Sequence, residues 1–143
     1  MLVSTILEAK GDVVATIPRT ATLGTAVAEL VRHRVGALVV SPGDGTIDGI
    51  LSERDVVRCL SELRADMMDQ PVHTVMSVKV HLCSPDASVD AVMNLMTEER
   101  IRHVPVVVDG RLAGIISIGD VVKTRIGELE KDRNELMEYI TAR

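Results

Sequence analysis

The stretch "GILSERDVV" (residues 49–57) returns later in the chain as "GIISIGDVV" (residues 114–122), with Gly, Ile, Ser, Asp, Val and Val at matching places. In each copy an apolar run ends at a Ser, and an Asp follows three residues later. The two copies are offset by 65 residues, and Arg34-Val35 aligns with Arg100-Ile101 at an offset of 66. Self-similarity at a fixed spacing is the signature of a repeated structural unit. The sequence therefore predicts two copies of one unit.

Each copy indicates the element order β-α-β-β-α. Continuous apolar runs predict strands that are covered on both faces, at 13–17, 37–40 and 47–51 in the first copy and at 78–83, 104–108 and 112–116 in the second. Apolar residues at helical spacing predict a half-buried helix after each first strand, through Leu23, Ala26, Val27, Leu30 and Val31 in one copy and Val89, Val92, Met93 and Met96 in the other. The one-residue change in offset falls in the turns "SPGDGTID" (41–48) and "VVDGRLA" (107–113), whose Asp-Gly signals predict hairpins.

The predicted fold class is α/β (α+β), with two β-α-β-β-α repeats packed through their sheets about a pseudo-twofold axis. A unit of about 60 residues buries little surface alone, which favours this pairing. The expected boundaries are 1–66 for the first repeat, 67–77 for a linker, 78–126 for the second repeat and 127–143 for a C-terminal helical extension. A heptad-like seam, interrupted once by Arg, follows the last helix: Val122, Ile126, Leu129, Arg133, Leu136 and Ile140. This seam needs cover from its own domain or a second chain, and we favour a homodimer.

Composition excludes several function classes. Tyr139 is the only aromatic residue and the formal net charge is −5, which argues against nucleic acid as a partner. Cys59, Cys83 and the four His show no metal-ligand spacing, so we expect buried, inert thiols in a reducing compartment. The N-terminus lacks the apolar run of a signal peptide, and no stretch is long enough to span a membrane. We therefore expect a cytoplasmic protein without membrane contact.

Local chemistry leaves two interpretations of the repeated Ser-x-x-Asp spacing. In the first, Ser52 with Asp55 and Ser117 with Asp120 are capping boxes, in which each hydroxyl and each carboxylate binds a backbone amide of its own helix. In the second, each junction binds an anion, because a helix start offers free amides and a positive end. Gly119 would let a ligand approach the backbone closely.

Cationic residues beside both junctions support the second interpretation: Arg34, Arg54, Arg58, Arg100, Arg102 and His103. Each Asp would then accept two hydrogen bonds from the vicinal hydroxyls of a ribose, and each Ser would donate to a phosphate. A purine would lie between aliphatic side chains, with its edge bound by backbone groups near Ala15–Thr16 or Val80–His81. No set of nucleophile, base and orienting group is legible, so catalysis is not expected.

The chain resembles the cystathionine β-synthase (CBS) domain family over almost its whole length, as a tandem pair like that of small stand-alone bacterial proteins. The resemblance rests on "GDVVATIPRTATLGTAVAELVRHRVGALVV", "GILSERDVVR", "PVHTVMS" and "RIRHVPVVVDGRLAGIISIGDVVK", in that order. It implies two β-α-β-β-α units with two clefts between them, dimerisation into a flat disc, and binding of adenosyl ligands such as AMP, ADP, ATP or S-adenosylmethionine. It also implies that the motif Asp contacts ribose and the motif hydroxyl contacts phosphate.

Carried onto this chain, the resemblance favours Asp120 and Ser117 first, with Arg102 and His103 as phosphate contacts and His81 as an adenine-edge contact. The first site has Gly36-Ala37 where the second copy has Arg102-His103, so either Arg54 and Arg58 compensate or that cleft is empty. The full set of expected ligand-binding residues is Ser117, Asp120, Arg102, His103, His81, Ser52, Asp55, Thr16, Ala37 and Arg54.

The predicted function is a regulatory module that binds an AMP-, ADP- or ATP-type ligand as a metabolite or energy sensor. It requires no cofactor, performs no catalysis and is read by an effector protein of unknown identity. The alternative is a ligand-free interaction scaffold whose Ser-x-x-Asp motifs only cap helices.

Overall fold

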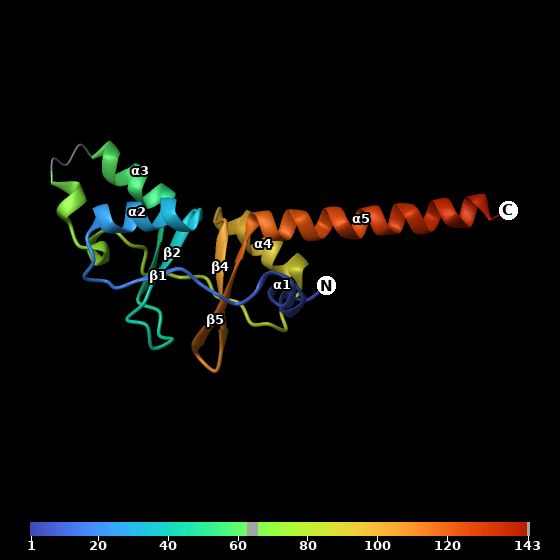
Figure 1. Ribbon diagram of the computed structural model, residues 1–143, viewed down its shortest axis with the longest axis horizontal. Coiled ribbons are helices and arrows are strands. Elements are labelled where there is room, and N and C mark those ends of the chain that lie inside the picture. The colour runs from blue at the N-terminus through green and yellow to red at the C-terminus, as the bar shows by residue number, and fades with distance from the viewer. Residues whose placement is uncertain (63–65, 143) are drawn as a thin grey trace.

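The computed structural model describes residues 1–62 and 66–142 (Figure 1). Its first half contains β1 (Thr16–Ile17), α2 (Leu23–His33), β2 (Ala37–Val40), β3 (Gly49–Ser52) and α3 (Glu53–Ser61). β1 pairs with β2 in parallel and β2 pairs with β3 in antiparallel orientation, which gives a three-stranded sheet in the order β1-β2-β3. This is the predicted β-α-β-β-α order, with a first strand shorter than the predicted 13–17.

The second half contains α4 (Val89–Glu99), β4 (His103–Val108), β5 (Arg111–Ser117) and α5 (Ile118–Thr141). β4 and β5 form an antiparallel hairpin in which Val108 lies opposite Arg111. The two turn residues, Asp109 and Gly110, both have positive φ, at 52° and 75°. A two-residue turn of this kind suits the right-handed twist of the paired strands, as the Asp-Gly signal predicts. The mixed α+β class is confirmed.

The strand predicted over 78–83 is wrong, because only Cys83 in that segment forms a bridge to β4. The reason lies in Pro105, which occupies the place that Val39 has in the first repeat. The Val39 amide donates to the Ala15 carbonyl at 3.1 Å and thereby extends the β1–β2 ladder. Proline has no N–H, so the matching hydrogen bond cannot form in the second repeat. The segment before Cys83 is therefore left outside the sheet.

The helices after the first strands begin and end alike in the two halves. The side chains of Thr22 and Ser88 accept hydrogen bonds from amides in the first turns of α2 and α4. The C-terminal caps Arg34 and Arg100 both have a φ of 55°. The predicted buried faces are confirmed except at Val31, which is 74% exposed on α2.

Two apolar cores form, one in each half, and each includes a segment that lies outside the β-α-β-β-α unit of its half. Two short 3-10 helices, η1 (Met67–Asp69) and η2 (Val72–Thr74), lie in the predicted linker and pack into the core of the first half. A further helix that the sequence analysis did not predict, α1 (Val3–Lys10), packs into the core of the second half. Packing therefore joins α1 to the second repeat, although the predicted boundary of 1–66 places it in the first.

Helix α5 extends far beyond the rest of the second half and ends near residue 141 (Figure 1). Its predicted seam is exposed, with Ile126 at 51%, Leu129 at 64% and Ile140 at 57%. No helix within residues 1–62 and 66–142 combines the length and apolar character needed to cross a membrane.

Candidate functional site

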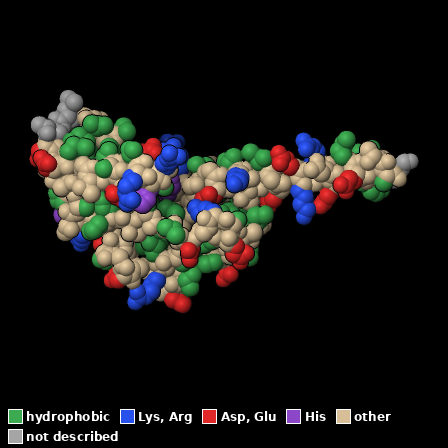
Figure 2. All heavy atoms as spheres, in the orientation of Figure 1, with side chains coloured by type: hydrophobic (Ala, Val, Ile, Leu, Met, Phe, Trp, Pro, Cys, Tyr) green, Lys and Arg blue, Asp and Glu red, His purple; other side chains and the backbone are tan. Residues whose placement is uncertain are grey.

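The first cleft, of about 230 Å³, lies beside the Ser52–Asp55 junction between the two halves. The Ser-x-x-Asp junction of one repeat faces the leading segment and the α4–β4 turn of the other. Its main lining residues are Ser52, Arg54, Asp55 and Arg58 at the β3–α3 junction, Ser77, Lys79, Val80 and His81 ahead of α4, and Arg100, Ile101, Arg102 and His103 between α4 and β4. On the face shown in Figure 2, basic and His side chains gather where the halves meet.

The second cleft, of about 400 Å³, has the reciprocal construction. The junction at Ser117 faces the leading segment and the α2–β2 turn of the first repeat. The main lining residues are Lys10, Val13, Val14 and Ala15 ahead of α2, Arg34, Val35, Gly36 and Ala37 between α2 and β2, and Ile115, Ser117, Ile118 and Gly119 at the β5–α5 junction. This exchange of segments gives the two clefts the symmetry predicted for a duplicated fold.

Both motif carboxylates cap their own helices, as the capping interpretation expects. Asp55 is only 3% exposed, and its two oxygens accept four hydrogen bonds. One oxygen accepts from the amide and hydroxyl of Ser52 at 2.8 and 3.1 Å. The other accepts from Arg58 at 2.6 Å and from the Ser77 hydroxyl at 3.3 Å. The carboxylate in the first cleft is therefore saturated by the protein.

Asp120 is held differently. Its Oδ2 accepts from the Ser117 amide at 2.8 Å and from Lys10 Nζ at 2.6 Å. Among the described residues, Asp120 Oδ1 accepts no hydrogen bond. Burial alone would raise the pKa of this carboxyl, but the hydrogen bond from Lys10 and that from the Ser117 amide outweigh it and hold the pKa below its ordinary value. Asp120 is thus ionised and has one acceptor atom to spare.

Ala37, Arg102 and His103 line both clefts, so they form a shared wall. Burial, and then the positive charge of Arg102, lowers the pKa of His103. A Cβ on Gly36 would stand 2.8 Å from Glu53 Oε1 and 3.0 Å from His103 Cε1. Any side chain at position 36 would therefore require the Glu53 carboxylate and the His103 ring to shift.

The family profile of the CBS domain matches residues 10–62 and 66–127. This chain belongs to the CBS domain family. Its two repeats are a CBS pair, which confirms the resemblance seen in the sequence.

Individual CBS proteins resemble this chain over most of its length. The mitochondrial CBS domain-containing protein CBSX3 of Arabidopsis thaliana is 37% identical over 123 residues, covering 83% of this chain and 60% of that protein. The chain thus spans about three fifths of the length of that curated relative. The crystal structure of the CBS-domain protein ATU1752 from Agrobacterium tumefaciens shares 42% identity with a TM-score of 0.84 and covers 87% of this chain and 99% of its own. The CBS protein PAE2072 from Pyrobaculum aerophilum, solved with AMP, shares 28% identity with a TM-score of 0.74 and covers 84% of this chain and 89% of its own.

The CBS pair distributes the predicted site residues unequally. The first cleft contains Ser52, Asp55, Arg54, Ala37, His81, Arg102 and His103. The second is lined by Ser117, Ala37, Arg102 and His103, whereas Asp120 is not a lining residue and binds Lys10, which is one. His81, expected as an adenine-edge contact, lines the first cleft and not the second, because the leading segment of each CBS repeat crosses to the other junction. Thr16 lines neither cleft, and its neighbour Ala15 lines the second one instead.

Sequence reasoning missed four polar residues of the clefts: Lys10, Glu53, Ser77 and Lys79. Lys10 ends a helix that carried no clear sequence signal. Ser77 and Lys79 align with Gly11 and Val13 of the first CBS repeat. Since the two repeats have unlike residues at these places, comparing one repeat with the other gave no reason to select them.

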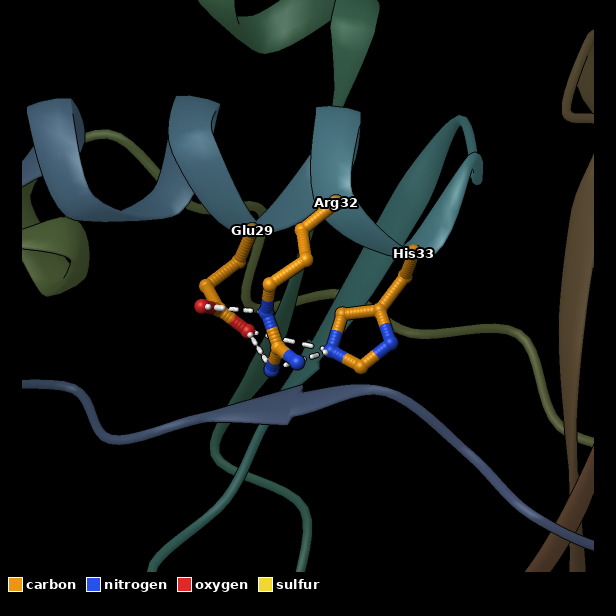
Figure 3. Close-up of polar contacts among 3 residues, drawn as sticks. All are labelled: Glu29, Arg32 and His33. Carbon is orange, nitrogen blue, oxygen red and sulfur yellow. Dashed lines mark hydrogen bonds and ion pairs between the residues drawn. The ribbon is translucent and has the colours of Figure 1, made fainter.

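Other polar clusters of the CBS pair lie outside the clefts. On α2, Glu29 binds Arg32 at 2.8 and 3.1 Å and His33 at 3.0 Å, all on one exposed surface (Figure 3). These three side chains satisfy one another, so they form a surface cluster. Within the described ranges 1–62 and 66–142, no group of His, Cys, Asp and Glu is arranged to hold a metal ion.

Proposed function

We propose that this CBS pair is a regulatory module that binds an adenosyl ligand of the AMP, ADP or ATP type in the second cleft. The observation that carries the proposal is the spare Oδ1 of Asp120, which directly follows Gly119 and binds Lys10, two lining residues of an open cavity of about 400 Å³. Pockets of 300–1,000 Å³ are typical for small-molecule ligands. A ribose diol needs an acceptor of this kind, and Asp120 has one that the protein does not use.

The remaining groups of the second cleft suit the rest of such a ligand. The Ser117 hydroxyl accepts from the Asp120 amide at 3.3 Å, and its own hydrogen, which contributes a hydrogen bond to the Asp120 carboxylate, would turn to a phosphate when the ligand binds. Lys10 lies 2.6 Å from Asp120 and could move to the phosphate once the diol occupies the carboxylate. Val14, Ala15 and Ile115 offer an aliphatic surface for a base. The AMP complex of the CBS protein from Pyrobaculum aerophilum supports this ligand class.

Regulation fits the site better than catalysis. Cys83 is the thiol nearest to a cleft histidine in sequence, and burial raises its pKa to about 11, so it is protonated near neutral pH. Cys59 is buried in the first core. A ligand that binds one arrangement of the two repeats better than another would shift their packing, and an effector protein would read that shift.

Calorimetry of AMP, ATP and S-adenosylmethionine against three proteins tests the ligand site. Asp120→Ala removes the diol acceptor and should weaken binding about 10- to 100-fold, the usual loss for hydrogen bonds to a charged group. Asp86→Ala, which removes an exposed carboxylate outside both clefts, should bind like the wild type. If no adenosyl compound binds at millimolar concentration, or Asp120→Ala binds equally well, the scaffold alternative replaces the sensor.

We also propose that the partner of the exposed apolar faces is a second copy of this chain. An apolar groove of about 490 Å³ lies between α2 and α3, where Val31 is 74% and Val57 62% exposed. The seam of α5 adds Leu129 and Leu136, at 64% and 60%. Such contiguous apolar surface on helices is typical of an interface.

Light scattering coupled to gel filtration measures this association. The wild type should elute at twice the chain mass, and Leu129→Glu should shift the equilibrium toward monomer because it places a charge in the seam. Lys131→Glu, on the outer side of the same helix, should leave the mass unchanged. A wild type that stays monomeric at high concentration contradicts the proposal.

A further inference from the structure

The first cleft carries a concentration of positive charge that the second cleft does not share. Asp55 is the only carboxylate among its lining residues. Five cationic side chains line it: Arg54, Arg58, Lys79, Arg100 and Arg102. His81, which lies 3.5 Å from Glu99, and His103 also line this cleft. The chain as a whole has a formal net charge of −5, so the charge gathered in this cleft is opposite in sign to that of the whole chain.

Most of this charge is not neutralised by the protein. Arg58 pairs with Asp55 at 2.6 Å, and Arg54 donates to the backbone carbonyl of Arg100 at 2.8 Å. Within residues 1–62 and 66–142, Lys79, Arg100 and Arg102 have no carboxylate within 4.0 Å. Like charges that face one cavity repel one another, and an anion bound between them removes that repulsion.

Asp55 cannot accept hydrogen bonds from the hydroxyls of a ribose in the same cleft. It is 3% exposed and already accepts hydrogen bonds from Ser52, Arg58 and Ser77. A diol would have to displace Arg58 and Ser77 to reach it, which would leave a buried carboxylate poorly paired. The first cleft therefore offers cations for an anionic ligand but no spare acceptor for a sugar.

We propose that the first cleft binds a phosphoanhydride chain through its charge alone, with no requirement for a nucleoside. The cavity of about 230 Å³ is below the range of most drug-sized ligand sites, which suits a small, highly charged group. The source of the chain is either free polyphosphate or the triphosphate end of a nucleotide. This inference goes beyond the proposed adenosyl site, because it concerns the other cleft and depends on different residues.

Substitutions of Lys79 and Arg100 test the first cleft alone, because both residues line it and neither lines the second cleft. Both are exposed at the cleft wall, so a substitution there should leave the fold intact. Arg102 lines both clefts and cannot separate them. The matched control is Lys131→Glu, which makes the same charge change on the exposed side of α5.

Calorimetry with sodium tripolyphosphate and with adenosine tests the proposal on the full chain. Tripolyphosphate should bind the wild type, and raising the salt from about 50 mM to about 500 mM should weaken it at least about 10-fold, since screening acts on a charge-driven contact. Lys79→Glu and Arg100→Glu should each weaken it about 10-fold or more, whereas Lys131→Glu and Asp120→Ala should not change it. Adenosine should not displace it.

The outcomes separate this proposal from the adenosyl site. If ATP binds but tripolyphosphate does not, the phosphate-chain proposal is wrong and the adenosyl site stands. If tripolyphosphate binds and neither AMP nor S-adenosylmethionine does, the reverse holds, because these two adenosyl compounds have no phosphoanhydride chain. Equal binding by wild type and Lys79→Glu, with unchanged thermal unfolding of both, would also overturn the proposal. Displacement by adenosine, or loss of binding in Asp120→Ala, would place tripolyphosphate in the second cleft instead.

Discussion

The two Ser-x-x-Asp junctions share one backbone and differ in what surrounds their carboxylates. Ser52 has φ −111° and ψ 165°, and Ser117 has −103° and 163°, so each strand turns into its helix in the same way. Yet Asp55 is buried and saturated, whereas Asp120 has an unused oxygen and a lysine partner. Duplication has preserved the turn and changed the chemistry beside it.

The difference arises in the opposite repeat. Ser77 supplies a hydroxyl to Asp55, and the aligned residue in the first repeat is Gly11, which has no side chain to offer Asp120. Lys10, one residue earlier, approaches Asp120 instead. In a CBS pair whose leading segments cross over, the properties of each motif therefore depend on a distant residue, 110 positions before Asp120 in one case and 22 positions after Asp55 in the other.

The largest effect on stability should come from substituting Gly49, which begins the first motif as Gly114 begins the second. In Gly49→Ala the new Cβ would stand 2.7 Å from the Ser77 carbonyl oxygen, which already accepts from the Ile50 amide. Backbone must shift to relieve this contact, so the free energy of unfolding should fall by about 1–3 kcal/mol. In Gly114→Ala the nearest atom is Cδ2 of Leu7, at 2.7 Å, and a side-chain end can rotate away.

Urea unfolding of both variants measures the difference. Gly114→Ala should stay within about 1 kcal/mol of the wild type, because a rotamer change absorbs the contact. The Gly49→Ala variant should also weaken tripolyphosphate binding, since Ser77 contacts Asp55 and lines the first cleft. Equal losses of stability in the two variants would show that the two motif starts are packed alike, which contradicts the comparison.

Much of the fold could be predicted because its signals are local. The run "ALVV" forms β2 with the predicted bounds of 37–40, since a short apolar run bounded by a turn signal is typical of a buried strand. Helix α1 escaped prediction for the opposite reason. It has no side-chain hydrogen bond at its N-cap, and only Val3 and Ile6 are buried, so neither a cap nor an apolar stripe was legible.

The site was harder to predict because the clefts are assembled across the repeats. The contrast between Arg102-His103 and Gly36-Ala37 was visible in the sequence, and Arg102 and His103 do line the second cleft together with Ser117. Sequence comparison did not reveal that both residues also line the first cleft, where Arg54, Arg58, Lys79 and Arg100 add further positive charge. Periodicity identifies which side chains share a face of one element, and it does not tell which segment crosses to a distant junction.

The smallest expected effect concerns the ion pair that distinguishes Asp120. Lys10 and the Ser117 amide hold the pKa of Asp120 below its ordinary value of 3.8, against the opposing effect of burial. A lowered carboxyl pKa means that the ionised form stabilises the folded state. That contribution is complete above pH 3.8 and is lost as the pH falls through the lowered value in the folded protein.

Lys10→Met should therefore reduce the free energy of unfolding by about 0.5–1 kcal/mol at neutral pH, the range of a partly exposed pair. The deficit should shrink below pH 3.8, where protonation of Asp120 removes the pair from the wild type as well. Urea unfolding of wild type and variant at a series of pH values measures it, with Lys131→Met as the control, because Lys131 and Glu135 form an exposed pair 3.8 Å apart that should contribute little. A deficit that persists unchanged into acid would mean that Lys10 acts through the packing of its methylene chain, and that its charge does not set the difference between the two junctions.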